Sequence, residues 1–394
     1  MRRIAWLLLL LFAFAIPWEY SLDMGEPLGN IARIVGLLLL LTAIPALLQS
    51  GRLRPPGPMQ GLVLAFFLWF CCSYFWTIEP LETVTKLRGY FQEFMIVWLL
   101  WEFAESARDL RKLLRATVAG SWVLALLTIA SFLSAAPEAA EQVRFTASGQ
   151  DPNDVARFLS LAFPLAALLF DSERRWYWRL LAVGYLPLGL VAVLLTASRG
   201  GFLAAVVGLA GSGVLLAVGH RRRVQAIALA LPPLAAVLWF TLPRGTFARL
   251  ATIGEQLQGG DLNQRMNIWS AGWHAFVKAP FFGTGAGTFV SAAGTSPVDT
   301  AHNTALAIAV TGGLCALFLA TAIVAIAVWS ITQTRGPLRW ALAVALVVWC
   351  ITSLVATVEE SRSTWLLLAL IALAGRLAVD EPEAITACFP AAAP

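Results

Sequence analysis

Runs of about 20 apolar residues recur along the whole chain, and this feature limits the possible folds more than any other. Of the 394 residues, 59% are hydrophobic and only 13% are charged. A soluble domain carries roughly twice this charged fraction, whereas about 20 consecutive apolar residues are enough for a helix to cross a bilayer. The sequence therefore predicts an all-α, multi-pass membrane protein, with residues 1–394 forming a single membrane domain.

Hydropathy predicts about twelve transmembrane helices along the chain. They are expected at residues 4–18, 31–49, 61–77, 87–103, 113–134, 155–170, 179–197, 200–218, 224–241, 302–330, 338–357 and 363–379. The first 18 residues also fit a signal peptide that is cleaved after Ala15, and this alternative leaves the topology of the other spans unchanged.

The distribution of basic residues predicts the orientation in the membrane. Seventeen of the 28 Lys and Arg residues fall in the two termini and in the even-numbered connections between spans. Because Lys and Arg concentrate on the cytoplasmic side, we expect both termini in the cytoplasm. Topology then accounts for the net charge of +5, and we expect membrane lipids but no nucleic acid as partners.

The longest polar connection, residues 242–301, is expected on the outer side as a large loop between the ninth and tenth spans. Its segment NQRMNIWSAGWHAFVKAP (263–280) has helical periodicity and is predicted as an interfacial helix along the membrane surface. Pro280 ends this helix, and FFGTGAGTF (281–289) is expected to follow as a flexible link. One side of the predicted helix gathers Ile268, Trp269, Gly272, Trp273 and Phe276.

An arginine lies in the turn between two apolar spans, within VLLTASRGGFLA (193–204). On one interpretation Arg199 is an interfacial anchor whose guanidinium snorkels to the headgroups. Against this, anchoring arginines concentrate on the cytoplasmic side, and this turn is predicted on the outer side. Gly200 and Gly201 allow close backbone approach, and a helix N-terminus beside a guanidinium suits an anion.

Two more residues on the outer side are candidates for chemistry. Arg265 lies near the start of the loop helix, after Asp261 and Asn263 as possible caps, and its alternative role is a solvated residue paired with Asp261. His302 lies where the loop re-enters the membrane. It either helps Asn303 to cap the next helix or provides a neutral imidazole that takes a proton from a hydroxyl near neutral pH.

The acidic residues and cysteines predict no metal site. Asp151 and Asp154 in QDPNDVARF fit a turn and a helix start, with Asn153 or Asp154 as the cap. The cysteines form no C-x-x-C pair, and the alternate glycines at 283–287 do not follow a strand, which disfavours a nucleotide site. We expect an ion cluster on the outer side formed by Glu359, Glu360 and Arg362.

Four motifs, in this order, resemble the core of the O-antigen ligase and O-antigen polymerase superfamily. They are LTASRGGFLA, QRMNIWSAGW, P-FFGTGAGTF and AHNTALAIAVTGG, and the preceding QDPNDVARFLSLAFPLAALL is also similar. The resemblance covers roughly residues 145–320, and the first 140 residues match only in being hydrophobic spans.

The resemblance implies a glycosyltransferase of the bacterial inner membrane with its active site facing the periplasm. Such enzymes take a glycan from undecaprenyl diphosphate and need no metal or other cofactor. The acceptor is a hydroxyl of the lipid A–core oligosaccharide in a ligase, or of another lipid-linked glycan in a polymerase. By this resemblance Arg199, Arg265 and His302 are the catalytic residues. Their neighbours expected in substrate binding are Gly200, Trp269 and Asn303.

Physical chemistry agrees with these roles. The diphosphate leaving group gains charge as its bond to the sugar breaks, and two guanidiniums can hold that charge. Displacement by the acceptor hydroxyl, with His302 as base, inverts the anomeric carbon.

Three functions remain open on the sequence, and we favour the ligase slightly because one dominant loop adjoins the H-N motif. A polymerase of O-antigen or exopolysaccharide repeats shares the same motifs. A transporter of lipid-linked sugar is less favoured, because it would carry polar groups at mid-membrane and broken helices, whereas the spans here read as uninterrupted. A protein O-oligosaccharyltransferase is expected to have a longer chain.

Overall fold

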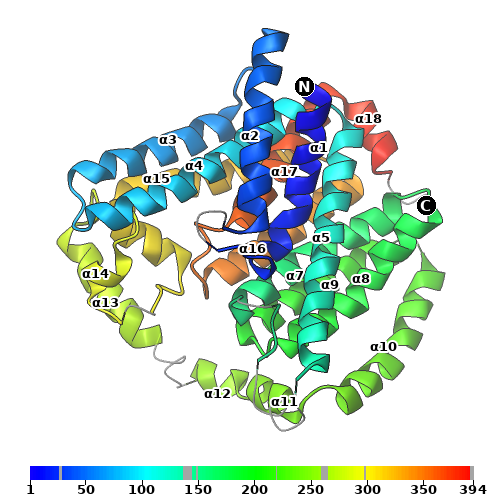
Figure 1. Ribbon diagram of the computed structural model, residues 1–394. Helices are drawn as coiled ribbons and strands as arrows, with labels where there is room; N and C mark the ends of the chain where they lie inside the picture. Colours follow the sequence, from blue (N-terminus) through cyan, green and yellow to red (C-terminus); the bar gives the residue numbers. More distant parts are fainter. Residues whose placement is uncertain are drawn as a thin grey trace.

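The protein is described by a computed structural model that covers residues 1–25, 29–135, 144–147, 150–218, 220–258, 265–296 and 299–390. Within these ranges all regular elements are helices, which confirms the all-α prediction. The helices form one bundle, with the N-terminus and α18 at one end and α11 and α12 at the other (Figure 1). The structure is that of a multi-pass membrane protein.

The twelve predicted spans all coincide with helices. The N-terminal half contains α1 (Arg2–Ala15), η1 (Ile16–Ser21), α2 (Ile31–Ser50), α3 (Pro58–Cys72), η2 (Ser73–Phe75), α4 (Pro80–Phe103), α5 (Ala107–Leu133), α7 (Pro152–Ser172), α8 (Trp176–Leu195) and α9 (Arg199–Ala217). The C-terminal half contains α10 (Arg221–Thr241), α11 (Arg244–Ala251), α12 (Ile253–Gln258), α13 (Arg265–Lys278), α14 (Phe289–Ala293), α15 (Thr304–Gln333), α16 (Gly336–Ser353), α17 (Arg362–Asp380) and α18 (Pro382–Cys388).

In the described part of the chain, 11 helices are long and apolar enough to cross a membrane. The remaining predicted span is α4, which has 24 residues but carries several charged side chains along its length. It is nevertheless built into the bundle, where it packs against α3 and α17.

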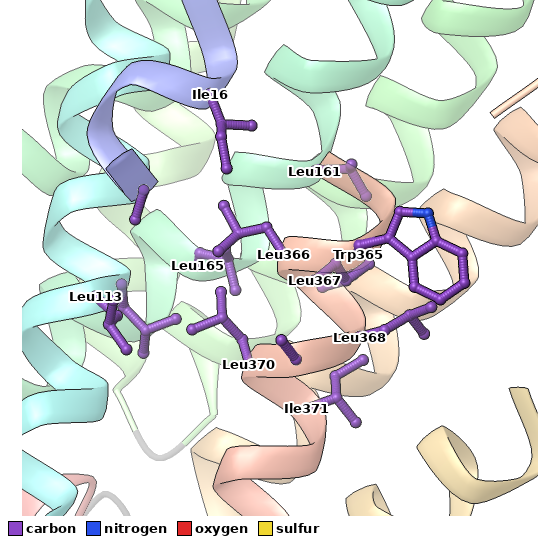
Figure 2. Close-up of a cluster of buried hydrophobic side chains, with 14 of the residues drawn as sticks. Ile16, Leu113, Leu161, Leu165, Trp365, Leu366, Leu367, Leu368, Leu370 and Ile371 are labelled. Carbon is purple, nitrogen blue, oxygen red and sulfur yellow. The ribbon is translucent and has the colours of Figure 1, made fainter. Parts of the chain in front are cut away.

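Two helices form the centre of the bundle. In the most apolar 18-residue segment of α7, 89% is buried inside the protein, and in the corresponding segment of α17 the buried share is 78%. Around α17 the side chains of Leu366, Leu367 and Leu370 meet Leu165 of α7 and Leu113 of α5 (Figure 2). Because these two helices are enclosed on nearly all sides by other helices, they fix the positions of the turns that connect to them.

Helix α10 is the opposite case. None of its residues is buried, and its main neighbour is α9. In Figure 1 it lies at the edge of the bundle. A helix that is apolar on all sides and exposed on all sides suits a lipid environment rather than water.

Helix α15 is interrupted at Gly313, which has φ 68° and ψ −168°. Past the break, the N–H of Leu314 donates to the carbonyl of Pro280 at 2.8 Å, and the indole of Trp69 donates to the carbonyl of Gly312 at 2.8 Å. The expectation of uninterrupted spans is therefore wrong for this helix. Interrupted backbone is tolerated inside a membrane protein only where other groups satisfy it.

The glycine-spaced link, residues 281–289, provides further hydrogen bonds to the backbone of α15 at the break. The N–H groups of Thr284 and Gly285 donate to the carbonyls of Val310 and Thr311, both at 2.9 Å. A Cβ on Gly285 would lie 2.1 Å from the hydroxyl oxygen of Thr77. The link was expected to be flexible, and the structure contradicts this: it is fastened into the gap of α15 by backbone hydrogen bonds and close packing.

The predicted loop helix is present as α13, and its packed side largely matches the predicted one. Ile268 and Gly272 are buried and Phe276 is partly buried, whereas Trp273 is 57% exposed. This side packs against α14 and α15, with Phe289 in the contact. The proposed caps Asp261 and Asn263 lie outside the described residues.

We predict that Gly285→Ala destabilises the protein by about 1–3 kcal/mol, because Gly285 has φ +109° and no room for a Cβ. The measurement is thermal melting of the purified protein in detergent. Gly213→Ala in α9 is the matched control, since a Cβ there meets nothing within 4 Å. Equal melting temperatures for the two variants would contradict the fastening of the link.

Candidate functional site

The candidate site lies at the end of the bundle where α8 turns into α9. This turn, the start of α7, helices α11 and α13, and residues 299–303 meet there through the contacts described below. We call this end of the bundle the loop end.

Arg199 is the first residue of α9, and its side chain reaches α11 and the residue after it. Its Nε donates to the carbonyl of Arg249 at 3.2 Å, and one terminal nitrogen donates to the hydroxyl of Thr252 at 2.6 Å. The hydroxyl of Thr252 in turn donates to the Arg249 carbonyl at 2.8 Å. Arg199 is half-buried, so it is held by the loop rather than extended freely toward headgroups as an anchor would be.

The residues around Arg199 explain why α9 begins here. Ser198 caps the helix by accepting a hydrogen bond from the N–H of Gly201 at 3.2 Å. A Cβ on Gly201 would lie 2.2 Å from that of Ala156, and one on Gly200 would lie 2.7 Å from Val355. The two glycines therefore allow α9 to approach α7 and the segment after α16 closely. The N–H of Gly201 is used by the cap, so it is not available to the anion that the sequence analysis expected at this helix start.

Two residues that the sequence analysis did not select hold this turn. Arg144 donates through Nε to the carbonyl of Thr196 at 3.0 Å and through a terminal nitrogen to the Oδ1 of Asn153 at 3.1 Å. The same Oδ1 accepts a hydrogen bond from the hydroxyl of Ser198 at 2.7 Å. Asn153 thus links the start of α7 to the residue that precedes Arg199.

Helix α13 is fixed to the segment that carries the histidine. The indole nitrogen of Trp269 donates to the carbonyl of Ala301 at 2.9 Å. Arg265 is half-buried at the start of the same helix. This contact holds the helix that carries Arg265 against the residue that precedes His302, and the expected role of Trp269 in substrate binding stays a prediction.

His302 has an unusual backbone conformation. In the described part of the chain only two residues other than glycine have positive φ, and they are Ala197 at 48° and His302 at 45°. Each precedes the cap of a helix, since Ser198 caps α9 and Asn303 caps α15. Such conformations are held in place by their surroundings and are concentrated at functional sites.

The capping role belongs to Asn303 and not to His302. The Oδ1 of Asn303 accepts from the N–H of Leu306 at 2.9 Å, and its amide nitrogen donates to the carbonyl of Leu354 at 3.4 Å. The Nδ1 of His302 lies 3.3 Å from the hydroxyl of Thr300. Among the described residues Nε2 has no hydrogen-bond partner, so the imidazole can present this nitrogen to a ligand.

Four guanidiniums share one electrostatic environment at the loop end. The pKa of Arg144 is lowered to about 10, first by burial and then by the charges of Arg249, Arg265 and Arg199, against the opposing charge of Asp151. Burial also lowers the pKa of Arg265, with Arg199 contributing in the same direction. Each arginine is therefore in the field of others, and this concentration of positive charge would be relieved by a bound anion.

His302 lies in the same field. Burial lowers the pKa of its imidazole from the usual 6.5, and the positive charge of Arg265 lowers it further, opposed by Asp151 and Asp299. The charge of Arg265 thus acts on His302, and the charge of Arg199 acts on Arg265. Because the pKa is lowered, the neutral form of the imidazole predominates at pH 7.

Helix α7 is capped by Asp151, so the predicted cap was wrong. Its Oδ1 accepts from the N–H groups of Asn153 at 2.7 Å and Asp154 at 3.4 Å, with Pro152 at the first helical position. The cap was expected to be Asn153 or Asp154. Asn153 is instead free of the capping role and bridges Arg144 and Ser198.

The expected ion cluster of Glu359, Glu360 and Arg362 does not form as predicted, because Glu360 and Arg362 pair with residues of other segments. Arg362 pairs with Glu19 and donates to Gln92 at 2.6 Å, and Lys86 pairs with Glu360 at 2.6 Å. Beside it, Arg157 of α7 is buried and donates to the hydroxyls of Ser361 and Ser363 at 2.9 and 2.8 Å and to Asp154 at 3.1 Å. These contacts tie α7 and α17 together. In the part of the chain that the structure covers, no group of three His, Cys, Asp or Glu side chains has the arrangement of a metal site.

The fold and this site define a multi-pass membrane protein with a cluster of arginines and a histidine at one end of its helix bundle. Residues 184–321 match the family described as O-antigen ligase. The matched segment runs from α8 into α15 and includes Arg199, Arg265 and His302. The resemblance to the O-antigen ligase superfamily, whose members are glycosyltransferase-like enzymes, is confirmed over this segment. No curated protein matches the chain.

We predict that Asn153→Ala reduces the turnover of the site about tenfold or more, because displacing a site residue by about 1 Å can cost up to 10²-fold. The variant removes the one acceptor that Arg144 and Ser198 share, so the turn before Arg199 loses its brace. Turnover is measured with the donor and acceptor that are proposed in the next subsection, and Asn267→Ala on the exposed side of α13 is the control. Equal rates for the two variants would remove Asn153 from the site.

Proposed function

We propose that the protein transfers a glycan from undecaprenyl diphosphate to a hydroxyl of the lipid A–core oligosaccharide. The family match supports the ligase and polymerase superfamily, and the arginine cluster supports a diphosphate-bearing donor. In this proposal the loop end faces the periplasm of a bacterial inner membrane, with both termini in the cytoplasm.

The observation that carries the proposal is the shared field of Arg199, Arg265 and His302. A diphosphate that leaves a sugar carries more negative charge in the transition state than in the donor, so fixed guanidiniums favour the transition state. Arginine also binds phosphate oxygens in pairs of hydrogen bonds and keeps its charge next to lipid. Gly200 lets the backbone of α9 approach the same anion.

The reaction is a single displacement. The acceptor hydroxyl oxygen forms a bond to the anomeric carbon of the donor sugar, and the bond from that carbon to the diphosphate oxygen breaks, with its electron pair leaving on the diphosphate. His302 takes the proton of the hydroxyl through Nε2. The attack comes from the side opposite the leaving group, so the configuration inverts. This scheme involves no metal.

A polymerase that uses another lipid-linked glycan as acceptor would employ the same three residues. The family match covers both activities. A transporter of lipid-linked sugar gains some support from the broken helix α15, because transporters place broken helices at their substrate sites. Here, however, the gap is filled by the protein's own link, and the titratable groups of the site lie at one end of the bundle rather than at mid-membrane.

Lipopolysaccharide analysis after deletion of the gene tests the proposal. We expect complete loss of polymer on the core, with long chains accumulating on the carrier lipid; a core that carries one repeat unit would instead identify a polymerase. Complementation with Arg199→Ala or Arg265→Ala should reduce transfer about 100-fold or more, and the Lys variants should be impaired through loss of paired hydrogen bonds. Normal transfer by both Ala variants, expressed at the usual level, would contradict the diphosphate site.

The pH dependence of transfer tests the base. Because the pKa of His302 is lowered below 6.5, the neutral imidazole is the main form above that value, and protonation removes it only below. We expect the rate to stay level from about pH 8 to about 6.5 and to fall in more acidic buffer. His302→Ala should lose transfer while donor binding is retained. Transfer by His302→Ala at the wild-type rate and with the wild-type pH profile would exclude His302 as the base.

A further inference from the structure

A cavity of about 230 Å³ lies between α15, α16 and α17, outside the arginine cluster. Its walls are mainly apolar and include Phe66, Trp349, Trp365 and Leu368. A cavity of about 150 Å³ with aliphatic walls already admits a benzene ring, so this space accommodates a segment of hydrocarbon chain. It is bordered by side chains of α15 that are open to the surroundings of the bundle, including Thr321.

The cavity begins directly behind the histidine. Thr304 and Ala305, the first two residues of α15, line it, and His302 precedes them by two residues. The hydroxyl of Thr304 donates to the carbonyl of Ala356 at 2.9 Å and accepts from the N–H of Val358 at 3.0 Å. The connection between α16 and α17 is therefore docked on the start of α15, and the cavity opens beneath the loop end.

One carboxyl group lines this otherwise apolar space. Glu359 is 6% exposed, and in the described part of the chain its buried Oε2 has no hydrogen-bond partner. Glu359 lies on the connection between α16 and α17, which places it at the level of the loop end. Buried polar groups are nearly always paired, so an unpaired oxygen in a cavity indicates a missing partner.

The protonation state of the Glu359 carboxyl decides whether its missing partner is a hydrogen-bond donor or an acceptor. The pKa of Glu359 is raised to about 8, first by burial and then by the nearby charge of Glu360, with Lys86 acting in the opposite direction. At neutral pH the group is then mainly a neutral acid with one O–H to donate. The other hydroxyls of the cavity are occupied, since Ser353 donates to Cys350 and Thr321 donates to Leu317.

We propose that this cavity binds an acyl chain of the acceptor glycolipid, with Glu359 donating a hydrogen bond to the carbonyl of its ester or amide. A polyprenyl chain has no acceptor for this O–H along its hydrocarbon, and the proposed function places its phosphates at the arginine cluster, whereas an acyl chain carries a carbonyl at the depth of the headgroups. The position of the cavity behind His302 directs the sugars of such a lipid toward the histidine. This inference rests on the proposed function and favours the ligase over the polymerase, whose acceptor is prenyl-linked.

Lipid binding by the purified full-length protein tests the proposal without any transfer reaction. The probes are lipid A, a diacyl phosphatidylglycerol and undecaprenyl phosphate, each measured by native mass spectrometry from the same detergent. We expect lipid A to be retained most strongly. Ala320→Trp, which fills the cavity, should weaken lipid A binding about tenfold, and the matched control Ala325→Trp, on an exposed position of α15 outside the cavity, should not.

Variants of the carboxyl group give a second measurement that does not depend on filling the cavity. Glu359→Gln keeps a neutral donor and should bind lipid A within about twofold of wild type, whereas Glu359→Leu should bind several-fold more weakly. Equal binding by the Leu variant would overturn the role of Glu359. Tighter retention of undecaprenyl phosphate that is lost in Ala320→Trp would assign the cavity to a prenyl chain, and equal retention of phosphatidylglycerol would reduce it to a site for bilayer lipid; either result overturns the proposal.

This test separates the two proposals. Arg199→Ala should leave lipid A binding unchanged, because Arg199 does not line the cavity. Lipid A binding at the cavity together with normal transfer by Arg199→Ala would contradict the diphosphate site alone. Loss of transfer by Arg199→Ala together with no difference between Ala320→Trp and Ala325→Trp would contradict the acyl site alone.

Discussion

A helix that crosses a bilayer must keep its backbone polar groups paired, and α15 does not do so on its own because Gly313 breaks its hydrogen-bond ladder. The link at 281–289 supplies the missing partners, with Thr284 and Gly285 bound to carbonyls before the break and Pro280 bound to Leu314 after it. The loop is therefore part of the membrane bundle rather than an appendage. Through Trp269 and Ala301 the same arrangement fixes α13 beside His302.

The site is then assembled from two rigid parts. One consists of α7, α8 and α9, where Asn153 and Arg144 brace the turn that presents Arg199. The other consists of α13 and the start of α15, which present Arg265 and His302. Where the two parts meet, the positive charges of Arg199 and Arg265 act on each other. The repulsion between them lowers the stability of the empty site and favours the binding of an anion, which is a common arrangement where charge develops during a reaction.

Hydropathy alone predicted the positions of all twelve long helices, because length and apolar composition determine whether a segment crosses a bilayer. The sequence also pointed to Arg199, Arg265 and His302, through their places in outer-side connections and through the family resemblance, although each had a structural alternative. The break at Gly313 was missed because the residues around it are apolar and small, and only their tertiary partners distinguish a gap from a continuous helix. The roles of Arg144 and Asn153 in holding the turn were missed for a related reason. They depend on contacts with residues 196–198, which are far away in the sequence and close in the structure. Whether the three selected residues carry the chemistry remains a prediction.

Helix α10 has no buried residue, and it is joined to the bundle mainly at α9 and by the ion pair of Arg223 with Asp171 of α7. It continues into α11, which with Thr252 receives the hydrogen bonds of Arg199. Extraction into a harsh detergent would let this outlying segment swing away and withdraw the support of one guanidinium, while the central helices stay folded. A preparation whose helix content by circular dichroism equals that of the native protein can then be inactive. Reconstitution into a bilayer would return α10 and α11 to their native positions.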